Sequence, residues 1–168
     1  MERQLGITPA LSALLSSAYD HLPHKPARTL LAPGGEVAWD DCCEGQLWVR
    51  VTSVSQAYIT PRGGGAAASQ CQPVRWDLSL AVGILRCAAV LDDDGNAPTP
   101  RAITADAAEM VEDMGSLADA VICHDSTDLE RVTLGSWTPL GPQGGCHGGE
   151  WAVTATVLVC ACETPEHR

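Results

Sequence analysis

The sequence has no phenylalanine, few basic residues and no long apolar run. No stretch approaches the roughly 18 unbroken apolar residues of a membrane-spanning helix. The 10 lysines and arginines are outnumbered by 21 acidic residues, which gives a formal net charge of −11. A surface this acidic repels phosphate groups, which argues against a protein that grips DNA or an anionic membrane. No signal-peptide core follows Met1, so we do not expect a secreted protein.

The 168 residues are 45% hydrophobic, and we expect one globular domain spanning 1–168. Apolar residues at helical spacing predict a helix over 8–21, with Thr8-Pro9 as N-cap and first helical position. Thr99-Pro100 predicts the same start for a second helix, although Thr104 is a rival start. The acids of this second helix, Asp113 among them, fall off its predicted buried stripe, which comprises Ile103, Ala107, Met110, Met114, Leu117 and Val121.

Alternating apolar and polar residues predict strands over 46–54, 76–84, 132–140 and 151–160. In the first strand, one face carries Leu47, Val49 and Val51, and the other carries Trp48, Arg50, Thr52 and Val54. We expect an α+β fold, an antiparallel or mixed four-stranded sheet flanked by two main helices in the order α-β-β-α-β-β. The remaining segments are predicted to be an extended loop over 23–45, a mobile hairpin loop over about 61–75 and a short flexible C-terminus over 163–168.

The eight cysteines are many for a chain without a secretion signal. A zinc site usually presents Cys-x2–4-Cys pairs, and the sequence has none, although Cys146-His147 supplies two adjacent ligand types. Disulfides across strands are a second reading, whose connectivity the sequence does not fix. Buried free thiols that act as small hydrophobic side chains are a third. These readings stay open for Cys42, Cys43, Cys71, Cys87, Cys123, Cys146, Cys160 and Cys162.

Three motifs resemble catalytic or ligand sites but lack the required arrangement. The glycine-rich segment 141–149 has no Lys-Ser/Thr and precedes a strand, which favours a hairpin turn over a phosphate loop. A calcium loop counted from Asp92 fails at its sixth and twelfth positions, so 92–96 is predicted to be a solvated turn. The adjacent residues His124-Asp125-Ser126 do not indicate a catalytic triad, because triads assemble from distant segments. We therefore expect no catalytic residues, no metal, no cofactor and no enzymatic activity.

Four segments of the chain carry a resemblance to a known family: Pro33–Val51, Leu85–Val90, Gly135–Pro142 and Gly144–Trp151. Together they resemble neck proteins of long-tailed siphoviruses that infect actinobacteria, in particular the tail-terminator family. The resemblance covers most of the chain and rests on these motif strings, with no catalytic signature. It implies an α+β subunit in a hexameric ring that caps the tail tube, ends tube polymerisation and joins the head connector.

The resemblance also implies partners and a location. The partners would be further copies of the chain, the tail tube protein and the head-closure protein, and DNA would pass through the ring lumen without sequence-specific binding. The protein would assemble in the host cytoplasm and end at the head–tail junction of the virion. Acidic residues lining the lumen would repel the phosphates of the passing DNA. Candidate interface or lumen residues are Trp39, Asp40, Asp41, Asp92, Asp93 and Asp94.

Three alternatives remain at this point. A head-closure, or stopper, protein of the same neck would lie directly under the portal and stay with the DNA-filled head. A small zinc-binding enzyme would use Cys146 and His147 as ligands. A secreted binding module stapled by disulfides would need a signal peptide, which the start of the chain does not show.

Overall fold

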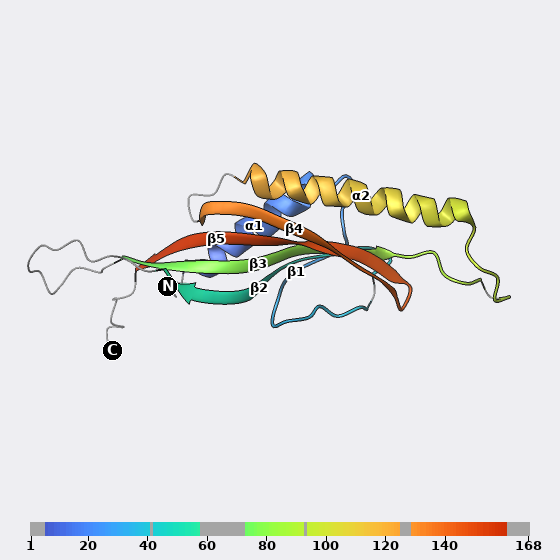
Figure 1. Cartoon of the computed structure of the whole chain (residues 1–168), viewed down its shortest axis with the longest axis horizontal. Coiled ribbons are helices and arrows are strands. Elements are labelled where there is room, and N and C mark those ends of the chain that lie inside the picture. The colour runs from blue at the N-terminus through green and yellow to red at the C-terminus, as the bar shows by residue number, and fades with distance from the viewer. Residues whose placement is uncertain (1–5, 41, 58–72, 93, 125–128, 161–168) are drawn as a thin grey trace, which may run out of the picture.

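The computed structural model describes residues 6–40, 42–57, 73–92, 94–124 and 129–160. Within these ranges, five strands form one mixed sheet in the order β1-β2-β3-β5-β4, and two helices cover one of its faces (Figure 1). β1 runs parallel to β2, and the other neighbouring strands are antiparallel. The elements are α1 (Ile7–His21), β1 (Arg28–Ala32), β2 (Gln46–Gln56), β3 (Pro73–Cys87), α2 (Pro100–Ile122), β4 (Leu129–Gln143) and β5 (Cys146–Cys160).

The α+β class agrees with the sequence, but the predicted four-stranded sheet and its order are wrong. The described chain has five strands in the order α-β-β-β-α-β-β. The extra strand is β1, which lies in the segment 23–45 that we predicted to be a loop. Its five residues are too few to show an alternating pattern, and its partner β2 begins 14 residues after β1 ends.

Two of the predicted loops fall largely outside the described part of the chain. Of the predicted hairpin loop at 61–75, residues 73–75 belong to β3. The rest of that loop lies outside the described residues, as does the predicted C-terminal segment 163–168.

The main core lies between the two helices and one face of the sheet. Leu14 of α1, Leu117 of α2 and Val49 of β2 are fully buried there. Burying one such side chain contributes about 1.5–3 kcal/mol, so this layer dominates the stability of the fold. The strands contribute alternate residues, including Leu47, Leu78, Leu80, Val82, Ile84, Val153, Ala155 and Val157.

A β-bulge in β2 changes the face that its second half presents. The pairing with β3 shifts register between Val51 and Ser53, after which Val54 lies opposite Leu78. Leu78 belongs to the core on the helix side, so Val54 shares that side rather than the face of Trp48. Our prediction for Val54 is therefore wrong, because one extra residue in a strand reverses the alternation beyond it.

The two helices begin in different ways. Thr99 caps α2 as predicted: its hydroxyl accepts a hydrogen bond from the Ala102 N–H at 3.2 Å, and a proline follows. Thr104, the rival start, lies inside this helix, where its hydroxyl donates to the Pro100 carbonyl at 2.7 Å. In α1 the N-cap is Gly6, without a side-chain hydrogen bond, so the predicted cap at Thr8 is wrong.

The buried side of α2 includes an acid that we expected on its outer side. Leu117 and Val121 are buried as predicted, but Ile103 is 54% exposed and Asp113 only 1% exposed. Arg86 of β3 reaches Asp113 with a fork of two hydrogen bonds, from Nε and Nη2, both 2.9 Å long. Its Nη2 also donates to the His24 carbonyl at 2.7 Å. This charged pair brings an aspartate inward where hydrophobic patterning predicts an exposed residue.

A tight hairpin joins β4 to β5. Its turn residues Gly144 and Gly145 both have positive φ, 58° and 79°, as a two-residue hairpin turn with this twist requires. The prediction of a hairpin turn within 141–149 is confirmed. The strands run further into this segment than we expected, since β4 ends at Gln143 and β5 starts at Cys146.

Candidate assembly surface

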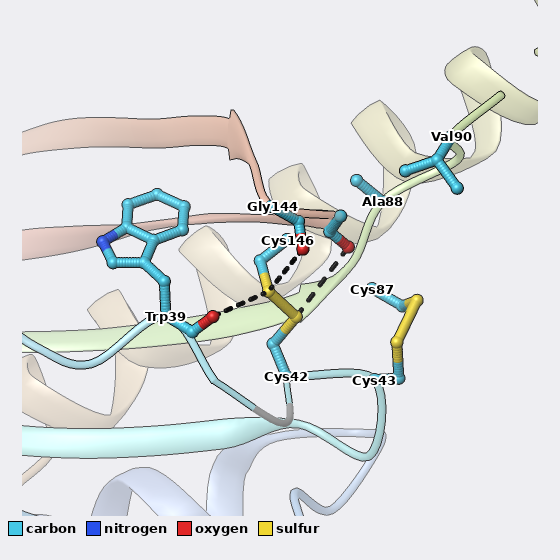
Figure 2. A pocket seen from close by; sticks show the side chains of 9 residues that line it. Trp39, Cys42, Cys43, Cys87, Ala88, Val90, Gly144 and Cys146 are labelled. Carbon is cyan, nitrogen blue, oxygen red and sulfur yellow. Dashed lines mark hydrogen bonds between the residues drawn. A yellow bond between two sulfur atoms is a disulfide. The ribbon is translucent and has the colours of Figure 1, made fainter.

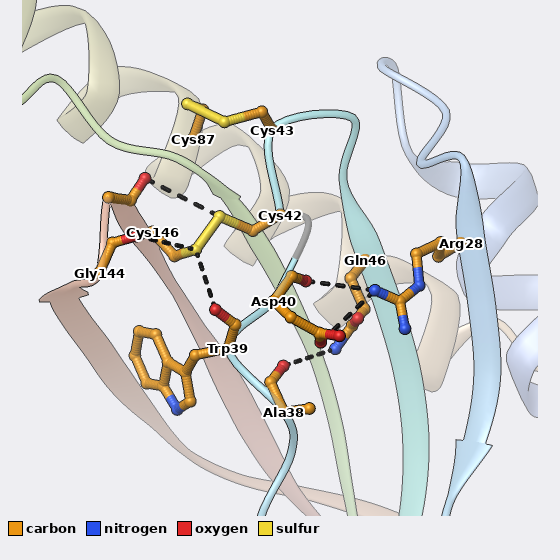
Figure 3. The surroundings of a disulfide bond; sticks show 11 residues. Arg28, Ala38, Trp39, Asp40, Cys42, Cys43, Gln46, Cys87, Gly144 and Cys146 are labelled. Carbon is orange, nitrogen blue, oxygen red and sulfur yellow. Dashed lines mark hydrogen bonds and ion pairs between the residues drawn. A yellow bond between two sulfur atoms is a disulfide. The ribbon is translucent and has the colours of Figure 1, made fainter.

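The segment between β1 and β2 crosses the sheet face that the helices leave open. We call residues 33–40 and 42–45 the strap. Three side chains of the sheet donate hydrogen bonds to its carbonyl groups. Arg50 donates to Gly35 at 2.7 Å. Gln46 donates to Ala38 at 3.0 Å and Arg28 to Asp40 at 3.2 Å (Figure 3). The strap thus lies along the sheet even though it forms no regular secondary structure.

A second, smaller hydrophobic cluster lies beneath the strap. Its centre is Trp48, which is fully buried and stands against Gly83, where a side chain would collide with the indole ring. The indole N–H donates to Glu150 Oε2 at 3.3 Å, and Arg50 Nη2 donates to Glu150 Oε1 at 2.6 Å. The cluster comprises Ala32, Cys42, Trp48, Leu85 and Cys146, with Leu30, Val37, Trp39 and Leu140 against it.

Two disulfides fasten the strap to the end of the sheet. Cys42 is bonded to Cys146, the first residue of β5, and Cys43 is bonded to Cys87, the last residue of β3. Cys87 and Cys146 are register partners, so two adjacent strap residues attach to two adjacent strands. The Cα atoms are 5.9 Å apart in the Cys42–Cys146 bridge and 4.0 Å apart in the Cys43–Cys87 bridge.

The structure gives the state of five of the eight cysteines. The disulfide reading applies to four of them: Cys42, Cys43, Cys87 and Cys146. Among the described residues, Cys123 is a free and exposed thiol. Cys71 and Cys162 lie outside the part of the chain that the structure describes.

Trp39 forms a wall between two surface pockets. The first, of about 260 Å³, opens beside the two disulfides and is also lined by Ala88, Val90 and Gly144 (Figure 2). The second, of about 230 Å³, is lined by Trp48, Arg50 and Glu150 among others. A half-buried indole on a strap that is covalently fixed is a suitable contact residue, because little conformational entropy remains to be lost on binding. Trp39 was predicted as an interface residue, and its contact role stays a prediction.

Reducing both disulfides should loosen the strap and leave the main core folded. The main core contains none of the four bonded cysteines, and the strap would keep only its hydrogen bonds and the contacts of the second cluster. A disulfide that closes a long loop contributes about 2–4 kcal/mol. Amide hydrogen exchange with and without a reductant should show faster exchange over 33–45 and unchanged exchange in α1.

A Cys123→Ser variant is the matched control, because its thiol is free in the folded chain. It should give the wild-type exchange pattern under oxidising conditions. Loss of protection throughout α1 and β3 upon reduction would show instead that the bridges hold the whole domain together.

The acidic residues that we predicted at the lumen or rim lie in two separate segments. Asp40 is in the strap, where its largely exposed carboxylate lies 3.5 Å from the partly buried side chain of Arg28. Asp92 and Asp94 are in the connection between β3 and α2. Asp41 and Asp93 lie outside the described residues. Whether any of these residues faces a lumen stays a prediction.

Asp92 organises its own turn. Its carboxylate accepts hydrogen bonds from the Asn96 side chain at 2.9 Å, the Asn96 backbone at 2.7 Å and the Asp94 backbone at 3.1 Å. These bonds favour the charged form, and the side-chain bond from Asn96 is the largest cause that lowers the pKa of Asp92 below its usual 3.8. The predicted solvated turn is thus also an ordered one.

The pKa of Asp92 gives the turn a definite pH dependence. The stabilisation should be fully present above the unfolded value of 3.8 and lost as the pH falls through the lowered folded value. An NMR titration should therefore give Asp92 a pKa below 3.8, and Asn96→Ala should move it back toward 3.8. A wild-type Asp92 that titrates at or above 3.8 would contradict the hydrogen-bonded turn.

The ligand pair of the zinc-enzyme alternative does not converge. Cys146 belongs to the cluster under the strap, and its sulfur is bonded to Cys42. Adjacent residues of a strand point to opposite faces, so His147 points to the helix side, in register with Arg86. Within the described ranges, no group of three or more His, Cys, Asp or Glu residues could hold a metal ion.

Sequence reasoning missed a concentration of exposed apolar side chains along α2. Ile103, Val111 and Ile122 on this helix are 54%, 57% and 67% exposed, and Val90 and Leu91 precede it at 60% and 61%. Large exposed apolar areas on a soluble protein usually mark an interaction site. Val111 and Ile122 fall between the positions of the predicted buried stripe, a signal that the sequence already carried.

Comparison with known proteins adds no family to this description. No protein-family model matches the sequence, and neither does any curated protein. Over the described residues, neither helix combines the length and the apolar character needed to cross a membrane.

Proposed function

We propose that this protein is a structural subunit of the neck of a long-tailed phage. Copies of the chain form a ring, hexameric in the family that the sequence resembles, which caps the tail tube and ends its polymerisation. The same ring joins the head connector, and the genome passes through it. The protein converts no substrate in this role.

The observation that carries the proposal is the set of large apolar residues exposed on α2 and on the connection before it. Five of the six large hydrophobic residues exposed in the described chain are there: Val90, Leu91, Ile103, Val111 and Ile122. A subunit of an assembly needs apolar area on its outside, where it contacts its partners.

The edge strand β4 is poorly suited to pair with a strand of another copy. We therefore expect copies to contact one another through other surfaces. β4 is an edge strand with three irregularities in its pairing to β5, and it contains Pro139 and Pro142. Arg131, at the first of these irregularities, has a positive φ of 52°. Bulges and prolines block pairing with a further strand, so this edge is protected against uncontrolled polymerisation.

The proposal is tested in infected cells in which this gene is silenced. Electron micrographs should show tails of uncontrolled length beside DNA-filled heads without tails, and a plasmid copy of the gene should restore normal particles. Heads that lose their DNA beside tails of normal length would assign the protein to head closure instead. Particles of normal form and number would overturn a neck function.

A further inference from the structure

We propose that the two disulfides of the strap open in sequence, so that reduction of one bridge releases both covalent attachments of the strap. A dithiol reductant opens the Cys43–Cys87 bridge, and the freed Cys87 thiolate then attacks the Cys42–Cys146 bridge. The product has a new bond between Cys87 and Cys146, which joins two strands of the sheet and leaves the strap unattached. This exchange would occur whether or not the chain forms a ring.

The two bridges differ in their access to solvent. Cys43 and Cys87 are both exposed, whereas Cys42 is 3% exposed and Cys146 is 2% exposed. All four cysteines line the pocket of about 260 Å³ beside Trp39, so the two bridges lie close to each other (Figure 2). A reductant from solution therefore meets the Cys43–Cys87 bridge first, because attack on a disulfide requires access to one of its sulfur atoms.

The sheet holds Cys87 and Cys146 in the arrangement that a new bond requires. They are register partners on the antiparallel strands β3 and β5. At the next position along, the Ala88 N–H donates to the Gly145 carbonyl at 2.7 Å. Hydrogen-bonded and non-hydrogen-bonded pairs alternate along an antiparallel ladder, so Cys87 and Cys146 form a non-hydrogen-bonded pair, with Cα atoms roughly 4.5 Å apart. Disulfides usually span Cα separations of roughly 4.4–6.8 Å, so these two cysteines are within bonding reach.

The first step is an ordinary reduction of the exposed bridge. One thiolate of the dithiol attacks a sulfur atom of the bridge and forms a mixed disulfide, which the second thiol of the reductant then resolves. The S–S bond between Cys43 and Cys87 breaks, and a disulfide forms within the reductant, which is oxidised by two electrons. Cys43 and Cys87 each become a thiol and take up the two protons that the reductant loses.

The second step is an exchange within the chain. Cys87 loses its proton to water, and its thiolate attacks the Sγ atom of Cys146. The bond between Cys42 and Cys146 breaks as the bond between Cys87 and Cys146 forms, and Cys42 leaves as a thiolate that takes a proton from water. The number of disulfides does not change in this step, so no further reductant is consumed.

The product frees the strap with two electrons, whereas reduction of both bridges takes four. The strap would keep only its hydrogen bonds to the sheet, among them those from Arg50 and Gln46, and the contacts of the second cluster. Trp39 would move with the strap, because two bonds near it no longer fix its position. The contact role predicted for Trp39 would therefore depend on the redox state of the Cys43–Cys87 bridge.

Disulfide mapping after limited reduction tests the exchange. The oxidised full chain is treated with dithiothreitol until one bridge per molecule is lost, then alkylated and digested with trypsin and a protease that cleaves after glutamate. Peptide 37–44 contains Cys42 and Cys43, peptide 87–101 contains Cys87, and peptide 132–150 contains Cys146. Before reduction, 37–44 should be joined to both other peptides. Most singly reduced molecules should instead join 87–101 to 132–150 and carry two alkyl groups on 37–44.

Amide exchange reports on the strap in the same samples. Loss of one bridge should make exchange over 33–45 about tenfold faster or more, which is the rate expected after complete reduction. Cys123→Ser, which removes the exposed free thiol of α2, should give the wild-type map and exclude Cys123 as the attacking group.

Cys43→Ser and Cys87→Ser form a matched pair, because each removes the exposed bridge but only Cys43→Ser keeps the attacking thiol. Without any reductant, Cys43→Ser should show the bond between Cys87 and Cys146 and fast exchange over 33–45. Cys87→Ser should keep 37–44 joined to 132–150 and keep the protected strap. Thermal unfolding shows that both variants are folded, and the map of the wild-type chain decides the question without them.

Three results would overturn the sequence of steps. The first is a set of singly reduced molecules that mostly keep 37–44 joined to 132–150. The second is a bond between Cys42 and Cys43 within peptide 37–44, and the third is loss of the buried bridge before the exposed one. An oxidised chain that lacks the two bridges at the outset would also overturn the inference. None of these results changes the proposed neck function, which the morphology of the particles tests.

Discussion

Replacing Asp113 with alanine should lower the free energy of unfolding by about 3–5 kcal/mol, which is a large part of the stability of a domain. Asp113 is 1% exposed and Arg86 is 6% exposed, and the fork of two hydrogen bonds joins β3 to α2. Without Asp113, the guanidinium would stay buried with Glu109, 3.8 Å away and partly exposed, as its nearest carboxylate. Urea unfolding followed by circular dichroism measures the change.

Two further variants distinguish the cost of leaving a charge buried without its partner from the cost of losing a contact. Asp119→Ala removes an exposed acid from the same helix and should change stability by less than about 0.5 kcal/mol. The double variant Arg86→Met/Asp113→Leu removes both charges and should recover much of the loss, because two apolar side chains can replace a buried ion pair. A double variant as unstable as Asp113→Ala would show that the geometry of the pair, rather than its charge, is required.

Replacing Trp48 with alanine should cost about 3–5 kcal/mol and release the strap. Trp48 is fully buried at the centre of the second cluster, and its indole N–H donates to Glu150. The cavity left by the indole would lie directly under the strap, between β2 and the second pocket. Urea unfolding gives the energy, and amide exchange over 33–45 reports on the strap.

Trp48→Phe is the matched variant, since it keeps most of the apolar volume and loses the hydrogen bond to Glu150. Its cost should be clearly smaller than that of Trp48→Ala. A cost below about 1 kcal/mol for Trp48→Ala would contradict the second cluster as a true core.

Much of the fold could be predicted because most elements are long and their patterns are regular. The alternation of Leu78, Leu80, Val82 and Ile84 marks β3, and Thr99-Pro100 marks the start of α2. β1 could not be predicted, because five residues held by a parallel neighbour carry no periodic signal of their own. The face of Val54 also could not be predicted, because a bulge depends on the pairing of two strands.

The candidate surface was predictable only in part. The adjacency of Trp39, Cys42 and Cys43 is visible in the sequence, but the partners of the two cysteines depend on which strand ends lie side by side. Hydrophobic patterning likewise predicts Asp113 on the outer side of α2. A pattern within one helix carries no information about a buried arginine on a strand of the sheet. The exposed apolar residues Val111 and Ile122 of α2 were missed because they lie off the regular stripe, which is the stronger helical signal in this segment.

The most direct measurement is a cryo-electron microscopy map of the neck of intact particles, at a resolution that lets this chain be fitted. We predict a closed ring of copies at the junction of head and tail tube, in which the exposed apolar residues of α2 lie in contacts with other subunits. A neck whose density excludes this fold, together with absence of the chain from purified virions, would contradict the proposal.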